Sequence, residues 1–203
     1  KDALTGCYVK LKDRDLYGEA LTMSHIESLA QLWDLSGSTR DADLALARYE
    51  YENTYAKSVI SGIYGGLYNV IVQANSVLRH LDCIEDSVAF RVLQGEAFAI
   101  RAFCHLDVLR LFGQMPQNPV RKVTLPYSED VSFKNLPRYY DYAAFCGKLE
   151  SDLLAAGNAL RVDPVISTSL TYSGQEDDFL DFRGLRLNYY AVKALQARFY
   201  LYT

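Results

Sequence analysis

The sequence predicts an all-α fold in which antiparallel helix pairs are joined by long irregular loops. Several long segments carry apolar residues at i, i+3, i+4 and i+7, the spacing that places side chains on one face of an α-helix. The segments between them lack a helical period and contain the Gly, Pro, Ser and Asp residues that favour turns. With 203 residues, half of them hydrophobic, the chain is long enough to bury a full core.

The segment from Gln94 to Pro116 is predicted to be the central helix. Its main apolar stripe consists of Leu93, Ala97, Ile100, Cys104, Val108 and Leu111. Much of the opposite face is also apolar, so this helix is expected to lie between other elements. We expect it to end at Gly113 in the left-handed conformation that glycine tolerates, with Pro116 preventing its continuation.

The helices of the chain are expected at residues 2–12, 24–35, 57–81, 86–112, 139–161 and 185–203. Asp2 is the expected N-cap of the first helix. Ser24 is expected to cap the second, in a capping box completed by Glu27 three positions later. In the helix at 57–81, interior glycines at 62, 65 and 66 indicate that another helix approaches closely there, since each costs about 0.5 to 1 kcal/mol against Ala.

The connections between these helices are unusually long. Residues 36–55 are predicted to form a loop with a short helical insert at 43–48, and residues 117–137 an extended segment with room for one short strand pair. Long loops in compact domains usually serve a function. The loop at 36–55 is therefore the first candidate for ligand contact.

Composition excludes several classes of function. A net charge of −4 and scattered basic residues argue against nucleic-acid binding, which needs a basic face. No apolar run reaches the length of about 18 to 20 residues that spans a bilayer. The four cysteines, at positions 7, 83, 104 and 146, have neither the spacing nor the neighbouring histidines of a metal site, and buried free thiols are favoured over disulfides.

Four groups of residues form a recognisable set. The central helix contains Gly95, Glu96, Ala97, Arg101, Ala102, Phe103, Phe112, Gly113 and Pro116. The other helices contain Ala3, Leu4, Gly6 and Tyr8, then Tyr68, Ile71, Asn75 and Leu78, then Asp152, Leu153 and Ala156. In residue type and spacing these groups resemble the SusD/RagB family of outer-membrane glycan-binding lipoproteins. The chain also begins without a targeting leader and ends inside a helical pattern. We therefore expect residues 1–203 to be the amino-terminal helical domain of such a protein, truncated at both ends.

The resemblance implies a fold and a function. The expected scaffold is tetratricopeptide-like, with helix 57–81 paired to 86–112 and helix 139–161 paired to 185–203. The expected function is non-catalytic binding of an oligosaccharide on the outside of the outer membrane, for delivery to a SusC-like TonB-dependent transporter. A lipid-bearing cysteine upstream of Lys1 would be the only membrane attachment, and neither a cofactor nor a metal is expected.

The candidate binding residues are aromatic and polar side chains on and beside the long loop. A sugar presents apolar C–H faces and hydroxyl rims, so its site needs exposed rings together with hydrogen-bonding groups. The candidates are Trp33, Tyr49, Tyr51, Asn53, Tyr55, Tyr64 and Asn69. For any single ring, packing in the core is the competing interpretation.

Catalysis has weaker support in the sequence. His25, His80 and His105 are dispersed, and none lies beside a nucleophile in a recognisable motif. Glu96 and Arg101 lie in an apolar helix, where each is expected to pair with a group on another element. The acidic run at positions 176–178 and 181 admits a glycosidase or calcium-site interpretation, but a solvated loop is more common. A helical-repeat adaptor for protein partners is the second hypothesis, and a carbohydrate-processing enzyme is the third.

Overall fold

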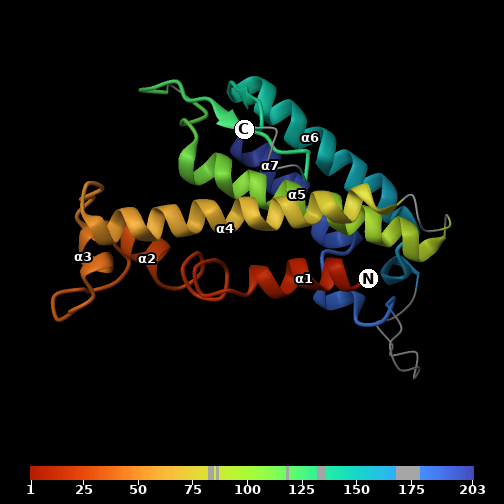
Figure 1. Cartoon of the computed structure of the whole chain (residues 1–203), viewed down its shortest axis with the longest axis horizontal. Coiled ribbons are helices and arrows are strands. Elements are labelled where there is room, and N and C mark those ends of the chain that lie inside the picture. Colours follow the sequence, from red (N-terminus) through yellow and green to blue (C-terminus); the bar gives the residue numbers. More distant parts are fainter. Residues whose placement is uncertain (82–84, 86, 118, 132–135, 168–178) are drawn as a thin grey trace. The chain divides into compact units, whose positions relative to one another are not determined.

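The computed structural model describes residues 1–81, 85, 87–117, 119–131, 136–167 and 179–203. The α-helices are α1 (Asp2–Leu11), α2 (His25–Leu29), α3 (Asp41–Ala47), α4 (Thr54–Arg79), α5 (Val88–Phe112), α6 (Tyr142–Ala159) and α7 (Tyr189–Tyr202). Three 3₁₀ turns are η2 (Leu160–Val162), η3 (Pro164–Ile166) and η4 (Arg183–Leu185). The strands described are the short antiparallel pair β1 (Leu125–Pro126) and β2 (Tyr139–Tyr140). β1 lies in the segment 117–137 that was expected to hold a strand pair, whereas β2 lies beyond it, where a helix was expected to begin. The predicted all-α class is confirmed (Figure 1).

The chain forms two compact units, and their boundaries fall inside α1 and α4. Unit 1 comprises Lys1–Thr5 and Ile71–Thr203, and unit 2 comprises Gly6–Val70. Unit 1 therefore contains α5, α6 and α7, whereas unit 2 contains α2, α3 and most of α4.

Helix α5 is the centre of unit 1, as predicted from its apolar character. Fifteen of its residues between Val92 and Leu109 are buried. It packs along α6, and α6 packs along α7, so the expected contact between the last two helices is confirmed (Figure 1). Gly95 explains how closely α5 approaches the end of α6, because a Cβ at this position would lie 2.5 Å from the Leu160 side chain. Ser87 caps α5 by accepting a hydrogen bond from the Phe90 backbone N–H at 3.2 Å.

The predicted ending of α5 is wrong in its conformation. Gly113 has φ −84° and ψ −175°, which is extended backbone and not the left-handed region. Glycine is still required there, because a Cβ would lie 2.3 Å from the Leu109 carbonyl oxygen. Close approach of the backbone, and not a left-handed turn, accounts for Gly113.

One hydrophobic cluster of unit 2 forms where α3 packs on the first turns of α4. Ala45 and Leu46 of α3 cluster with Ala56 of α4, and Val59 and Ile60 cover them. The prediction that another helix approaches the three glycines of α4 is wrong: at Gly66 the close neighbour is Leu16, in the turns that follow α1. A Cβ at Gly66 would lie 3.0 Å from the Leu16 side chain, whereas Cβ atoms at Gly62 and Gly65 would meet nothing within 4 Å.

The helix predicted at 24–35 is much shorter, and its capping box is wrong. Helix α2 has five residues, and the Ser24 hydroxyl makes no capping hydrogen bond. Its backbone has ψ −88°, far from the extended conformation that aims an N-cap side chain at the first amides. Ser24 Oγ is buried without a hydrogen-bond partner among the described residues. Asp2 is likewise the first helical residue of α1 and does not precede it as a cap.

Candidate functional site

Four of the predicted ring residues lie on the surface of unit 2. Trp33 follows α2, Tyr49 and Tyr51 follow α3, and Tyr55 lies in the first turn of α4. Their exposed fractions are 55%, 51%, 49% and 57%, respectively. These four residues are called the aromatic surface below. Within unit 2 these four rings therefore do not pack in the core, which was the competing interpretation.

The ends of the two short helices place three of these rings. After α3, the Glu50 N–H donates to Ala45 O and the Tyr49 N–H to Leu46 O, the paired hydrogen bonds of a Schellman motif. Such a motif needs a left-handed residue, normally glycine, and Tyr49 occupies that position with φ 57°. A bulky side chain held in this region costs about 1 to 2 kcal/mol. The conformation turns the chain sharply between the rings of Tyr49 and Tyr51, whose centroids are 6.3 Å apart.

Helix α2 ends in the same way. Gln31 has φ 57°, its N–H donates to Ser28 O, and the Leu32 N–H donates to Glu27 O. The side chain of Gln31 then crosses to the end of α3, where its Nε2 donates to Ala47 O at 2.8 Å. This hydrogen bond joins the loop that carries Trp33 to the end of the helix that precedes Tyr49.

A buried carboxylate fastens α2 to α3. Asp43 is 3% exposed, and its Oδ1 lies 2.8 Å from His25 Nδ1 and accepts a hydrogen bond from Ser28 Oγ at 3.3 Å. Its Oδ2 lies 2.8 Å from Arg40 Nε. Because both oxygens are engaged by neighbouring side chains, Asp43 holds the two short helices and does not face a ligand.

Asn53 serves the backbone at the start of α4. Its Oδ1 accepts a hydrogen bond from the Tyr55 N–H at 2.9 Å, and its carbonyl accepts one from the Lys57 N–H at 2.9 Å. The predicted residue therefore holds Tyr55 in place through its oxygen.

Tyr64 and Asn69 lie farther along α4. At a rise of about 1.5 Å per residue, they are about 14 and 21 Å along the axis from Tyr55. Tyr64 is half-buried and packs on Tyr68, with ring centroids 4.7 Å apart. Asn69 is exposed and lines a groove of about 210 Å³ with Lys10, Asp13 and Asp15. The structure thus divides the predicted set into the aromatic surface with Asn53, and two residues away from it.

The first buried polar cluster of unit 1 is centred on Arg101 of α5. Its Nε and Nη2 donate to the two oxygens of Asp152 on α6 at 2.6 and 2.5 Å, and Nη1 donates to Asn75 Oδ1 at 2.9 Å. The Tyr127 hydroxyl donates to Asp152 Oδ2 at 2.5 Å. Burial and the Asp152 carboxylate raise the pKa of Tyr127, so its hydroxyl remains a donor. The expected pairing of Arg101 with another helix is confirmed.

The second cluster pairs Glu96 with Arg183 of η4. Arg183 Nη1 donates to Glu96 Oε1, and its Nε and Nη2 donate to the oxygens of Asp163 at 3.0 and 2.6 Å. All three side chains are at most 2% exposed. Arg186 adds a contact of 3.3 Å to Glu96, so two cations offset two buried carboxylates. The predicted pairing of Glu96 is therefore also confirmed, and the cluster holds η3 and η4 against the central helix.

His105 is a structural residue, as expected. It is fully buried, its Nδ1 faces Arg101 O at 3.0 Å, and its Nε2 accepts from the Ser128 N–H at 3.2 Å. Its ring stacks on Tyr127 with centroids 3.8 Å apart. Burial, together with the charge of Arg101, lowers the pKa of His105 well below its ordinary value. A neutral imidazole with both nitrogens engaged has no free position for proton transfer to a ligand.

The remaining predictions on chemistry are partly outside the described residues. Of the acidic run, positions 176–178 lie outside them, and Asp181 is half-buried. Among the residues that the structure describes, no group of three or more His, Cys, Asp or Glu could hold a metal ion. Cys7 and Cys104 are buried and Cys146 is half-buried, whereas position 83 is not described. Burial raises the pKa of Cys7 to about 11.

The sequence did not identify the residues that shape the aromatic surface. Gln31 and Asp43 act through contacts that span 16 and 18 positions of the chain. The available signal was weak: a carboxylate between apolar residues of a short helix suggests a partner, but not which one. For Gln31 we find no sequence signal, since a polar residue in a loop is ordinary.

Comparison with known proteins identifies the fold. No family model matches the chain, and no curated protein matches it. The solved structures that match include two that cover 98% of the chain: a protein described as a candidate sugar binder from Bacteroides vulgatus, with TM-score 0.68, and a SusD superfamily protein from Bacteroides thetaiotaomicron, with TM-score 0.66. Each is 20% identical, and the chain spans 41% of the length of each. The fold of this chain is therefore SusD-like, as predicted.

Proposed function

We propose that this chain belongs to a surface protein that binds a glycan without altering it, and that the aromatic surface is the contact. The main observation that supports this proposal is that four aromatic rings are exposed. Three of them follow the left-handed ends of α2 and α3, and the fourth lies at the start of α4. Exposed rings stack on the apolar faces of sugars, and the carboxylates beside them accept hydrogen bonds from hydroxyl groups. The SusD-like fold and the sugar-binding description of one structural neighbour support the same function.

The wider role follows by analogy with the family that the sequence resembles. The proposal is that the complete protein is a lipoprotein of the outer membrane, faces outward, and passes an oligosaccharide to a SusC-like TonB-dependent transporter. In this role residues 1–203 are its helical amino-terminal domain. Among the described residues, no helix is both long and apolar enough to cross a bilayer. Binding of this kind requires stacking and hydrogen bonding, and no covalent step.

The test removes two rings from separate loops. In the variant Trp33→Ala with Tyr51→Ala, retention by a panel of immobilised polysaccharides is expected to fall at least tenfold, because each stacked ring contributes an estimated 1 kcal/mol or more. The circular dichroism spectrum and the thermal midpoint should stay near those of the parent, since both rings are about half exposed.

A matched control removes two exposed tyrosines of unit 1. Tyr139 and Tyr190 are 62% and 55% exposed, so Tyr139→Ala with Tyr190→Ala is a comparable change outside the aromatic surface. It should retain binding. Equal retention of the parent and of the Trp33/Tyr51 variant would show that the aromatic surface does not bind the glycan.

A protein-binding adaptor is the second candidate, and one observation favours it. Helix α7 exposes Tyr190, Tyr200 and Leu201, with fractions of 55%, 55% and 88%. Such a face suits a helical partner. A pull-down that returns a stoichiometric protein partner, together with no retention on any polysaccharide, would support the adaptor over the glycan binder.

A further inference from the structure

An acidic residue directly follows three of the four residues of the aromatic surface in the chain. The sequence places Asp34 directly after Trp33, Glu50 after Tyr49 and Glu52 after Tyr51. Asp34 and Glu50 are exposed, and the Glu52 side chain is 94% exposed. A ligand stacked on these rings therefore meets acceptor oxygens at its rim.

Two of these carboxylates are held ionised by their neighbours. A hydrogen bond of 3.0 Å from the Ser36 N–H to Asp34 Oδ1 lowers the pKa of Asp34. The Lys57 ammonium, 2.5 Å from Glu52 Oε2, lowers the pKa of Glu52. The charge of the surface is therefore negative at neutral pH.

The cations of the same segment are largely engaged by carboxylates. Residues 31–57 contain five acidic and three basic residues, a net charge of −2. Arg40 lies 2.8 Å from the buried Asp43 and 3.5 Å from Glu19, and Lys57 pairs with Glu52. Arg48, which is exposed, is the third. Lys57 offsets the charge of Glu52, so Asp34 and Glu50 are the carboxylates that a ligand bearing carboxylate or sulfate groups would face as like charges.

We infer that the aromatic surface selects uncharged glycans and rejects those with uronate or sulfate groups, an inference that rests on the proposed glycan-binding function. Sugar hydroxyls donate to Asp34, Glu50 and Glu52, whereas an anionic substituent at the same place meets repulsion and leaves those acceptors without donors. Discrimination arises from the charge that surrounds the rings, since stacking itself is available to both kinds of sugar.

Affinity electrophoresis of the intact chain tests this selection. The neutral polymers are laminarin, dextran, pullulan, galactomannan and xyloglucan, and the anionic ones are polygalacturonate, alginate and chondroitin sulfate. Retardation at least tenfold stronger by a neutral polymer than by any anionic one is the expected result. Equal or stronger retardation by an anionic polymer overturns the inference and leaves glycan binding standing. Retardation by none of the eight, with no effect of the Trp33/Tyr51 variant, counts against the proposed function itself.

A second variant tests whether the carboxylates cause the discrimination. In Glu50→Gln with Glu52→Gln, two negative charges are lost and Lys57 is released from its partner. Retardation by polygalacturonate is expected to rise at least threefold at low salt, and the gain should vanish at high salt, where exposed charges are screened. An unchanged preference in this variant would contradict the assignment of selectivity to these residues.

The matched control releases a lysine in unit 1. Glu129 and Lys148 form a pair at 2.5 Å, the same distance as Glu52 and Lys57. Glu129→Gln should leave retardation by every polymer unchanged. An equal gain per negative charge removed would show that overall charge, and not the surroundings of the rings, decides the preference.

Discussion

Two residues of unit 2 adopt a left-handed backbone conformation that is unfavourable in free energy for a residue with a side chain. Tyr49 adopts φ 57° at a position where glycine is usual, and Gln31 does the same at the end of α2. Strained residues persist where surrounding contacts hold them, and they often lie at functional sites. Here the contacts are the Schellman hydrogen bonds and the link from Gln31 to Ala47 O.

The variant Tyr49→Gly separates the ring of Tyr49 from its strain. Glycine relieves the left-handed conformation, so the free energy of unfolding should be equal to that of the parent or higher by up to about 1 kcal/mol. Glycan retention should nevertheless fall at least fivefold, because one stacking surface is lost. Urea denaturation and affinity electrophoresis measure the two effects.

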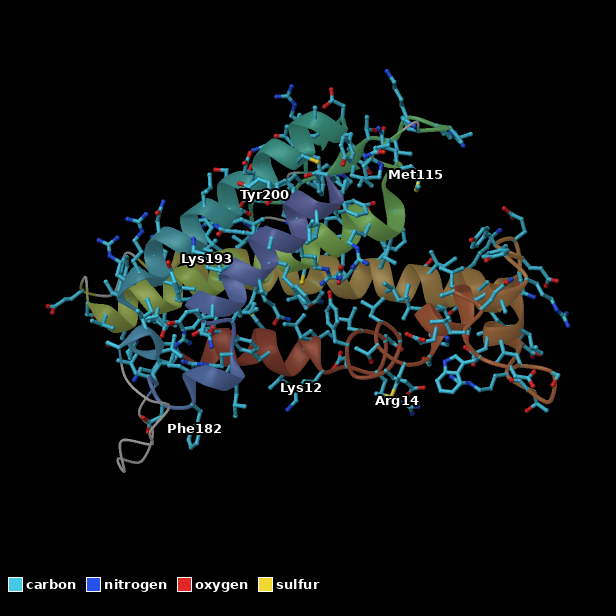
Figure 2. The ribbon with its side chains drawn as sticks, turned by 180° about the vertical axis from the view of Figure 1, so that it is seen from behind. Lys12, Arg14, Met115, Phe182, Lys193 and Tyr200 are labelled. Atoms are coloured by element: carbon cyan, nitrogen blue, oxygen red, sulfur yellow. The ribbon has the colours of Figure 1, made fainter. Side chains whose placement is uncertain are left out.

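Phe182→Gly is the control for this prediction. Phe182 has φ 52°, is 61% exposed and points outward from η4 of unit 1 (Figure 2). The substitution removes an exposed ring and the same backbone strain, and retention should not change. A Tyr49→Gly variant that binds as the parent does would show that Tyr49 takes no part in binding.

Packing at the scale of elements depends on where a backbone comes close to a neighbour. Gly95 of α5 faces Leu160 and the Ala156 carbonyl, whereas Gly147 of α6 is exposed and has nothing within 4 Å of its would-be Cβ. Both glycines lie inside helices, where the residue by itself is unfavourable. The sequence pattern alone treats them alike, but their surroundings differ.

The two glycines should respond in opposite directions to Ala. Gly95→Ala is expected to lower the free energy of unfolding by about 1 to 3 kcal/mol, because the new methyl group overlaps Leu160. Gly147→Ala is expected to raise it by about 0.5 to 1 kcal/mol through helix propensity. Denaturant titration of both variants provides the comparison. Similar stabilities for the two would argue against tight packing of α5 on the end of α6.

At the scale of the whole chain, the two units differ in where their charged and aromatic residues lie. Unit 1 contains two buried clusters of charged residues, around Arg101 and Glu96. Unit 2 exposes the rings and carries the left-handed helix ends that present three of them. Removing one partner of a buried pair typically costs about 3 to 5 kcal/mol, so these clusters resist change and suit a scaffold.

Stability of the chain should fall in mild acid because of His105. Burial lowers the pKa of His105 in the folded state, so below about pH 6.5 the unfolded chain binds a proton that the folded chain does not. This contribution is present above pH 6.5 and is lost as the pH falls from there toward the folded pKa. Between pH 7.5 and 5.5 the free energy of unfolding should fall by roughly 1 kcal/mol.

Urea titrations at several pH values measure this effect. Glutamine at position 105 cannot titrate. In the variant His105→Gln the free energy of unfolding should therefore change less between pH 7.5 and 5.5, by the amount given above, whatever the absolute stability of the variant. Parallel pH profiles for the parent and the variant would exclude His105 as the source.

Local pattern was sufficient to predict the long elements of this protein. The periodicity of α4, α5, α6 and α7 identified each helix within a few residues, because apolar spacing is set by the helix itself. The same reasoning showed that Glu96 and Arg101 need partners, since an unpaired charge in an apolar helix is too costly. The resemblance of the central motif predicted the SusD-like fold that the structural matches confirm.

What only the tertiary structure decided depends on contacts between residues far apart in the chain. Arg183 and Arg186 became the partners of Glu96, and Asp152 that of Arg101, among several acids and bases that the pattern could not rank. Helix α2 ends at Leu29 because a left-handed Gln31 is held by Ala47, 16 residues away, which leaves Trp33 exposed outside the helix. Periodicity records which way a helix faces, whereas the end of a marginal helix is set by the neighbours that folding brings to it.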